Sequence, residues 1–93
     1  MRDKIEEYVA EVQRLVDAEK SIFPETVSVE YLKRYARIVT SRGTLSRSVH
    51  SFVDLETGDI LKAASWKAPA KGVRGNVSDL TKGFSAYGAW YAR

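Results

Sequence analysis

Few side chains in this chain of 93 residues could carry out acid–base, nucleophilic or metal chemistry. The chain has one histidine, His50, and no cysteine, which excludes a thiolate nucleophile and a cysteine-based zinc site. A lone histidine within a predicted strand more often packs through hydrogen bonds than acts as a general base. Asp54, Glu56 and Asp59 lie together, but acids at such a position usually stabilise the turn itself. The sequence therefore predicts a protein that is not an enzyme, with no catalytic residue, no metal site and no cofactor.

A basic segment around one tryptophan, residues 62–76, is the first candidate binding site. Cations beside an indole suit a ligand that combines phosphates with flat bases. Asn76 also predicts the cap of a short helix over residues 77–82, whose first N–H groups would favour an anion. In the alternative interpretation, the tryptophan fills the core and the lysines cover a loop. The candidate nucleic-acid or phosphate ligands in this segment are Lys62, Trp66, Lys67, Lys71, Arg74 and Asn76.

A second candidate surface lies on the strand predicted over residues 34–40. Strand alternation would place Tyr35 and Arg37 on one face, together with the flanking Lys33 and Val39. Interleaved basic and aromatic residues are typical of sheets that bind single-stranded DNA or RNA. The residues expected to add phosphate contacts are Lys33, Arg37 and Arg42. The alternative is that Tyr35 lies half-buried beneath a helix.

The charged residues are unevenly distributed along the chain, although the net charge is only +3. Residues 1–30 hold four basic and eight acidic residues, whereas residues 31–93 hold eleven basic and four acidic ones. The stretches 31–53 and 60–78 contain no acid at all. A molecule with an acidic and a basic end attracts phosphate-bearing or acidic partners to the basic end. The same cations also keep an exposed sheet in solution, so both interpretations stay open.

An N-terminal amphipathic helix is expected over residues 2–20. Its apolar residues recur at the three- and four-residue spacing of one helical face, and acids crowd its first turns. Phe23-Pro24 should end this helix, because the residue before a proline avoids the helical conformation. The residues of the predicted buried face are Ile5, Tyr8, Val9, Val12, Leu15 and Val16.

A change of period after Pro24 predicts an antiparallel meander of three to four strands. Residues 27–40 supply one or two of them, and residues 48–53 and 60–66 supply the others, with Gly58 in the turn between. Such a sheet needs a cover on one face, which the N-terminal helix provides. The expected fold class is α+β, in a single small domain of residues 1–93 with a short C-terminal helix and an aromatic tail.

The aromatic tail is expected to close the core, because its residues recur at three- and four-residue steps. These residues are Phe84, Tyr87, Trp90 and Tyr91. No apolar run approaches the roughly 20 residues of a membrane span. The charged first residues predict no signal peptide, and the lack of cysteine fits a reducing cytoplasm.

The second half of the chain contains four recognisable motifs. They are Phe52-Val53-Asp54, Thr57-Gly58-Asp59-Ile60, the run 62–71, and Arg74-Gly75-Asn76-Val77. Together they resemble a family of small uncharacterised proteins from tailed bacteriophages, over about residues 49–93. The resemblance implies a phage accessory protein made in the cytoplasm of the host bacterium. It implies no activity, cofactor or site residue for this chain.

Two functions are consistent with these patterns. In the first, the protein is a non-catalytic accessory protein that binds DNA or RNA through its basic, tryptophan-containing loop. In the second, it is a phage effector that inhibits a host protein or sequesters a signalling nucleotide. The acidic helix face of Glu7, Glu11 and Asp17 would then be one docking surface. Neither function involves a membrane, self-association into a homo-oligomer is compatible with both, and a structural role in the virion is a third option.

Overall fold

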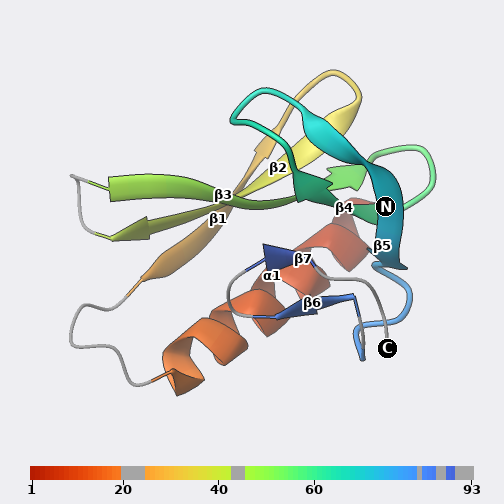
Figure 1. Cartoon of the computed structure of the whole chain (residues 1–93). Helices are drawn as coiled ribbons and strands as arrows, with labels where there is room; N and C mark the ends of the chain where they lie inside the picture. Colours follow the sequence, from red (N-terminus) through yellow and green to blue (C-terminus); the bar gives the residue numbers. More distant parts are fainter. Residues whose placement is uncertain (20–24, 43–45, 82, 86–87, 90–93) are drawn as a thin grey trace.

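One helix and a five-stranded antiparallel sheet form the body of the protein, and two short strands form a separate hairpin (Figure 1). The computed structural model describes residues 1–19, 25–42, 46–81, 83–85 and 88–89. The α+β class, the N-terminal helix and the antiparallel meander are confirmed. The predicted number of three to four strands is wrong, because the sheet has five.

Helix α1 spans Arg2–Ala18 and buries the apolar face that its sequence predicts. Ile5, Tyr8, Val12 and Val16 are its buried residues, and their spacing places them on one side of the helix. Asp3 in the first turn interacts favourably with the positive end of the helix dipole. The stop predicted at Phe23-Pro24 lies outside the described residues.

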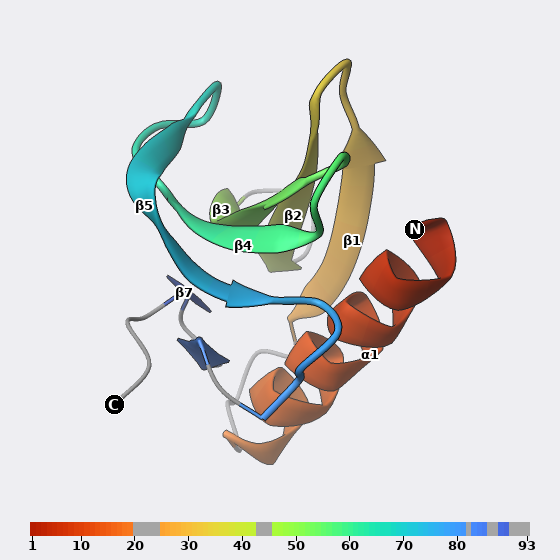
Figure 2. The ribbon, with the colours of Figure 1, turned by 90° about the vertical axis from the view of Figure 1, so that its right-hand side faces the viewer.

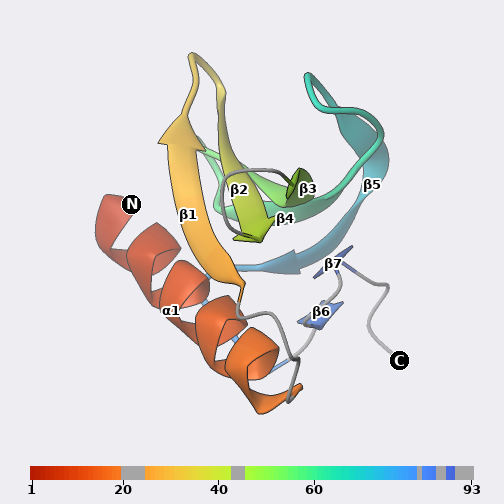
Figure 3. The ribbon, with the colours of Figure 1, turned by 90° about the vertical axis from the view of Figure 1, so that its left-hand side faces the viewer.

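The strands of the large sheet follow one another in chain order, each antiparallel to the last. Figures 2 and 3 show this sheet curling into a trough, with α1 lying outside it. A small hairpin of β6 and β7 lies near α1 and β5 in the same views. The strands are β1 Thr26–Tyr31, β2 Tyr35–Arg42, β3 Ser46–Asp54, β4 Asp59–Ala63, β5 Pro69–Asn76, β6 Phe84–Ser85 and β7 Gly88–Ala89.

Alternation along the strands gives the sheet two distinct faces. Ala36, Ile38, Val53 and Ile60 belong to the core cluster that includes the buried side of α1. The side chains that alternate with these residues along each strand line the inside of the trough. Among them, Phe52 is fully buried although no helix covers it. The hairpin from β3 to β4 turns at Gly58, whose φ of 78° is the positive value expected for a glycine in this turn.

A bulge in β3 determines to which face of the sheet the side chains of its N-terminal half point. Ile38 pairs with Ser51 but Val39 pairs with Val49, so His50 is the extra residue. Ser41 therefore pairs with Arg47. Without the bulge, Arg47 would stand opposite Arg42, and its side chain would point to the other face.

Strand β5 replaces the loop expected over residues 67–76. Ile60 pairs with Gly75, Leu61 with Val73 and Ala63 with Pro69, so β5 carries extra residues relative to β4. Gly72 accommodates one irregularity with a φ of 102°. A bulged edge strand containing proline and glycine shows no regular alternation, which is why its sequence resembles a loop.

The short C-terminal helix predicted over residues 77–82 is wrong for the described residues 77–81, which form turns. The Asn76 side-chain oxygen accepts a hydrogen bond from the Ser78 N–H, and Asp79 Oδ1 accepts one from the Thr81 N–H. Side-chain acceptors of this kind favour a turn over a helix where the sequence that follows lacks an extended apolar repeat. The cap predicted at Asn76 therefore exists, but it caps a turn.

The predicted third strand, 60–66, is also shorter than expected, since β4 ends at Ala63. The Ala64 and Ser65 N–H groups both donate to the Ala68 carbonyl, which closes a tight connection to β5. Trp66 lies in this connection. In the aromatic tail, Phe84 packs against the core cluster as expected, whereas Tyr87, Trp90 and Tyr91 lie outside the described residues.

Candidate nucleic-acid interface

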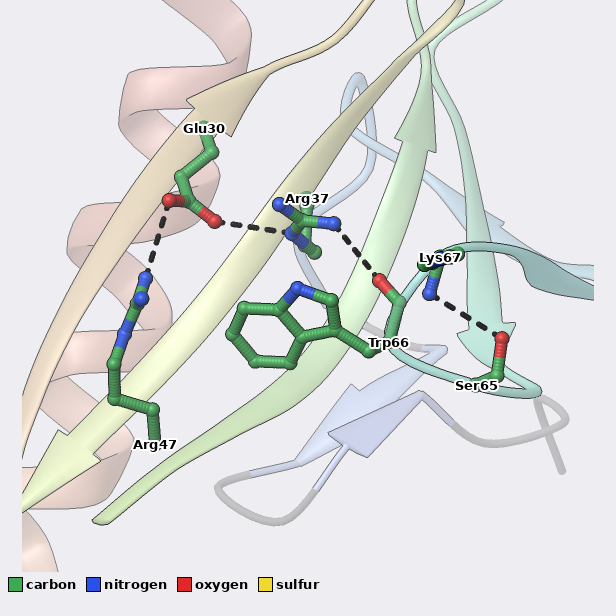
Figure 4. A network of polar contacts seen from close by, with 6 residues as sticks. All are labelled: Glu30, Arg37, Arg47, Ser65, Trp66 and Lys67. Carbon is green, nitrogen blue, oxygen red and sulfur yellow. Dashed lines mark hydrogen bonds and ion pairs between the residues drawn. The ribbon is translucent and has the colours of Figure 1, made fainter. Parts of the chain in front are cut away.

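Four side chains from three strands and one loop meet inside the trough (Figure 4). They are Glu30 of β1, Arg37 of β2, Arg47 of β3 and Trp66 of the β4–β5 connection, and are called here the arginine–tryptophan cluster. The guanidinium carbon of Arg37 lies 4.6 Å from the centre of the indole ring, and that of Arg47 lies 5.1 Å from it. Both distances are within the range of cation–π attraction.

Arg37 is the best-fixed cation of the cluster. Its side chain is only 13 % exposed. Its Nε donates to Glu30 Oε1 at 3.0 Å, and its Nη1 donates to the Trp66 carbonyl oxygen at 2.9 Å. A charge this close to burial is stable only when such partners hold it, so Arg37 joins β1, β2 and the β4–β5 connection.

Glu30 is shared between the two arginines. Its second oxygen accepts a hydrogen bond from Arg47 Nη2 at 3.1 Å. The hydrogen bond from Arg37, and then the one from Arg47, lower the pKa of the Glu30 carboxyl below its usual value. The carboxylate therefore stays ionised at neutral pH, and the cluster carries a net charge of one positive unit.

The indole of Trp66 neither fills the core nor projects freely into solvent. It is 37 % exposed and lies over side chains that rise from the sheet beneath it (Figure 4). The hydrogen bond from the Lys67 N–H to Ser65 Oγ tightens the loop on either side of it. A partly exposed indole held against two guanidinium groups is a ready stacking surface for a flat ring.

The floor beneath the cluster is apolar and closed. Val39 and Phe52 are fully buried, and the ring of Tyr35 meets that of Phe52 edge-on at 6.1 Å. The guanidinium group of Arg34 lies 5.6 Å from the centre of the Tyr35 ring. This packed floor makes the base of the trough rigid beneath the charged groups.

The structure brings three of the predicted site residues together and separates the others. Arg37 donates to the Trp66 carbonyl oxygen, and Lys67 is the exposed residue that follows Trp66 in the chain. Lys62 lies on the outer face of β4, because Leu61 shares the inner face with Phe52. Lys33 is exposed between β1 and β2, and Lys71 is exposed on β5.

The remaining predicted ligands make internal contacts. Arg42 pairs with Glu25 at 2.8 Å. The Asn76 amide donates to the Thr57 carbonyl and to Asp59 Oδ1, both at 3.0 Å, and so joins β5 to the β3–β4 turn. Arg74 is half-buried on β5. The sequence predicted an anion site at the start of a helix after Asn76. The described residues contain no helix there, so this prediction is no longer supported.

Sequence reasoning missed Arg47 and Glu30 as members of the site. Glu30 reaches the inner face through the β1–β2 register, and Arg47 reaches it through the β3 bulge. Glu30 alternates with Val29 and Tyr31, so its exposure away from the helix face could have been read from the sequence. Nothing in the sequence marks His50 as a bulge. The placement of Arg47 could therefore not be predicted from the sequence.

A hydrogen-bonded network lies under α1, on the other side of the sheet. The hydroxyls of Tyr8 and Ser51 are 2.7 Å apart, Ser51 Oγ is 2.8 Å from His50 Nδ1, and His50 Nε2 is 2.7 Å from the Ser85 carbonyl. Since that carbonyl only accepts, Nε2 is the protonated nitrogen, and Nδ1 accepts from Ser51. Ser51 and Tyr8 are fully buried, so this serine–histidine pair has no access to a substrate.

Burial shifts the titration of this network. Desolvation raises the pKa of the Tyr8 hydroxyl far above its usual value, and the hydrogen bond to Ser51 opposes this shift. Desolvation lowers the pKa of His50, opposed by the hydrogen bond to the Ser85 carbonyl. The network is therefore neutral at pH 7, and it connects α1, β3 and β6.

Other features of the described residues offer less chemistry. No group of three or more histidine, aspartate or glutamate side chains among them could hold a metal ion. No helix within the described ranges has the length and apolar character needed to cross a membrane. A cavity of about 360 Å³ lies between α1 and the turn before β6. Its lining consists of Glu11, Arg14, Leu15, Leu80, Thr81 and Phe84.

The fold and the cluster together define a small α+β domain with a cationic, aromatic face on the open side of its sheet. The chain belongs to a family of unknown function, DUF7717, whose model matches residues 2–89. The match includes α1, so it extends beyond the segment of about residues 49–93 in which the sequence motifs were seen. No curated protein and no solved structure matches the chain.

Proposed function

We propose that the protein is a non-catalytic module that binds single-stranded nucleic acid inside the trough of its sheet. The observation that carries the proposal is the half-open indole of Trp66, stacked on Arg37 and Arg47 above a rigid apolar floor. A base would stack on the exposed part of the indole, and the guanidinium groups would attract the adjoining phosphates. Sequence-tolerant binding is expected, because every base has a flat face.

The cations around the cluster support this proposal. Lys67 is exposed next to Trp66 in the chain, Lys71 is exposed on β5, and Lys33 is exposed beside β2. Flexible lysines bind phosphate mainly through charge and need no fixed geometry. Because each contact to a phosphate releases counterions, affinity for a single strand should fall with salt, by about 0.7 logarithmic units per contact for each tenfold rise.

The resemblance to small phage proteins supplies a cellular setting for the same proposal. We place the protein among phage accessory proteins that act in the cytoplasm of the host bacterium. DNA and RNA that are unwound during phage replication and expression would provide the single strands. The inactive position of the serine–histidine pair supports a binding role over an enzymatic one.

The host-protein alternative has weaker support. Of the three acids expected to form its docking face, Glu11 forms an ion pair with Arg14, and Asp17 accepts a hydrogen bond from Gln13. Glu7 is exposed. Two of the three acids are thus engaged within the helix, and the helix face offers less free charge than its composition predicts.

The test is a fluorescence titration of Trp66 in a variant that carries Trp90→Phe, so that one indole reports. Short single-stranded DNA and RNA, and a duplex of the same length, are added at low and at physiological salt. The expected result is quenching that saturates with single strands, weakens with salt and is much smaller with the duplex. No saturable quenching by either single strand at low salt would overturn the proposal, and capture of host proteins would be tested next.

A matched pair of variants tests whether the named surface is responsible. Lys67→Gln removes an exposed cation from the residue that follows Trp66, whereas Lys4→Gln removes an exposed cation from α1. The first should weaken single-strand binding about threefold, the order of one exposed cation–phosphate contact, and the second should leave it unchanged. Equal effects would mean that only net charge matters.

A further inference from the structure

The Glu30 carboxylate occupies a position that suits an anion from outside the chain. Arg37 Nε lies 3.0 Å from one carboxylate oxygen and Arg47 Nη2 lies 3.1 Å from the other (Figure 4). Two guanidinium groups from neighbouring strands thus converge on one pair of oxygens. Planar guanidinium donors in this arrangement match two oxygens of a phosphate as well as they match a carboxylate.

The donors would keep their positions if Glu30 moved away. Arg37 is also fixed by the Trp66 carbonyl oxygen at 2.9 Å, and both guanidinium groups lie against the indole. The bulge at His50, not Glu30, sets the direction of the Arg47 side chain. The cradle is therefore pre-organised by the sheet and the β4–β5 connection.

The Glu30 side chain is the part of this arrangement that we expect to give way to another anion. Its side chain is 37 % exposed, and β1 is an edge strand of the sheet. A partly exposed ion pair contributes little net free energy, so another anion can compete with it. The carboxylate can turn into solvent without leaving a buried charge behind, because the incoming anion takes its place between the arginines.

We propose that Glu30 is an internal anion that a ligand phosphate displaces, and that it sets the affinity of the cradle. The ligand class is a nucleotide phosphate whose base stacks on Trp66, either as a free nucleotide or within a single strand. The stacking of a base on Trp66 rests on the proposed function. The binding of a phosphate rests on the two arginines alone. The displacement makes Glu30 a specificity-determining residue for anions.

The experiment compares Glu30→Gln with Glu25→Gln in the full chain carrying Trp90→Phe. Both changes remove one negative charge from the region of β1, but the described partner of the Glu25 carboxylate is Arg42 and not a residue of the arginine–tryptophan cluster. Inorganic phosphate is titrated at constant ionic strength with sodium chloride as the balancing salt, and thermal stability and Trp66 fluorescence are recorded. Glu30→Gln should bind phosphate about tenfold more tightly than the wild type, as expected when one competing charged contact is removed. Glu25→Gln should match the wild type.

A stability signature accompanies this effect. Glu30→Gln removes the carboxylate that neutralises a nearly buried Arg37, so this variant should melt at a lower temperature than the wild type. Phosphate should restore that loss selectively. An equal response of both variants to phosphate, or no response of Glu30→Gln, would overturn the proposal.

A measurement on the wild type keeps the proposal testable if Glu30→Gln does not fold. Phosphate should shift the nuclear magnetic resonances of the Arg37 and Arg47 Nε–H groups together, and leave the Arg42 resonance in place. Shifts confined to other arginines, or none at high phosphate, would contradict the displacement of Glu30.

Further ligands distinguish the sources of the phosphate and separate the two proposals. The probes are adenosine, its 5′-monophosphate and a single-stranded oligonucleotide. If Glu30→Gln binds the monophosphate more tightly than the wild type and neither protein binds the oligonucleotide, the anion cradle is supported and the proposed function is overturned. Oligonucleotide binding that is the same in wild type and Glu30→Gln supports the proposed function and overturns the role of Glu30.

Discussion

The two faces of the sheet both carry polar clusters, but they differ in what surrounds them. Beneath α1, Tyr8, Ser51 and His50 form a neutral chain of hydrogen bonds that is buried from end to end. Inside the trough, Glu30, Arg37 and Arg47 form a charged chain that reaches solvent beside Trp66. In both clusters the polar groups have partners, so hydrogen bonding alone does not distinguish structure from function.

Exposure and charge make the difference. A buried neutral network has no competitor for its hydrogen bonds, and each bond adds to the cohesion of the fold. A charged cluster at the surface competes with water and with other anions, so its contacts can be exchanged. The helix-covered face thus holds the fold together, while the polar contacts of the open face can be exchanged.

The largest expected contrast comes from truncating one aromatic ring on each face. Tyr8→Ala should lower the free energy of unfolding by about 3–5 kcal/mol, because it empties a fully buried site and removes the hydroxyl that lies 2.7 Å from Ser51 Oγ. Trp66→Ala should cost less than about 1 kcal/mol, since the indole is partly exposed and lies against two guanidinium groups. Urea denaturation of both variants, followed by circular dichroism, measures the contrast.

Single-strand binding should show the reverse order in the same pair. Trp66→Ala should abolish it, and Tyr8→Ala should retain it wherever the variant is folded. A Trp66→Ala protein as unstable as Tyr8→Ala would show that the trough is a second core and not a binding face.

How far the sequence predicts these faces depends on how regular each element is. The spacing of Ile5, Tyr8, Val12 and Val16 specifies α1 and its buried side, and alternation specifies Ala36 and Ile38 beneath it. These features repeat over several turns or residues, so an isolated exception does not hide them.

The open face depends instead on single irregularities. The extra residue at His50 turns Arg47 toward Arg37, and the bulges of β5 bring the strand alongside β4 despite its proline and glycines. Trp66 and Arg37 could be selected as ligands from their residue types, but their contact could not, because it joins residues 29 positions apart. Side-chain acceptors at Asn76 and Asp79 likewise favour turns where spacing alone predicts a helix.

A pH titration tests the neutral character of the buried network. In the folded state, desolvation lowers the pKa of His50 below its usual 6.5. Between the folded-state pKa and 6.5, the unfolded chain therefore binds more protons than the folded protein. Stability should therefore be complete above pH 6.5 and should decrease as the pH falls below it. Among the described side chains, Tyr8 is the titratable group recorded in contact with His50, and it stays protonated throughout.

The measurement is the free energy of unfolding between pH 8 and pH 5. The wild type should lose stability at the acidic end, whereas His50→Gln, which cannot titrate, should show a flat profile at a lower level. A wild-type profile that is equally flat would mean that His50 is not buried as a neutral group.

The smallest expected effect belongs to the outer arginine of the open face. Arg47→Gln removes a 49 % exposed partner of Glu30 and should lower the free energy of unfolding by less than about 1 kcal/mol at low salt. At about 1 M salt the difference should vanish, because screening then acts over about 3 Å. Arg42→Gln is the matched control, since Arg42 is also half-exposed and paired with a glutamate, but it lies on no aromatic ring of the described residues. Only Arg47→Gln should change the emission of Trp66. A loss of several kcal/mol that persists in salt would show that the charged cluster is fixed like the buried network, and Glu30 could then not give way to a phosphate.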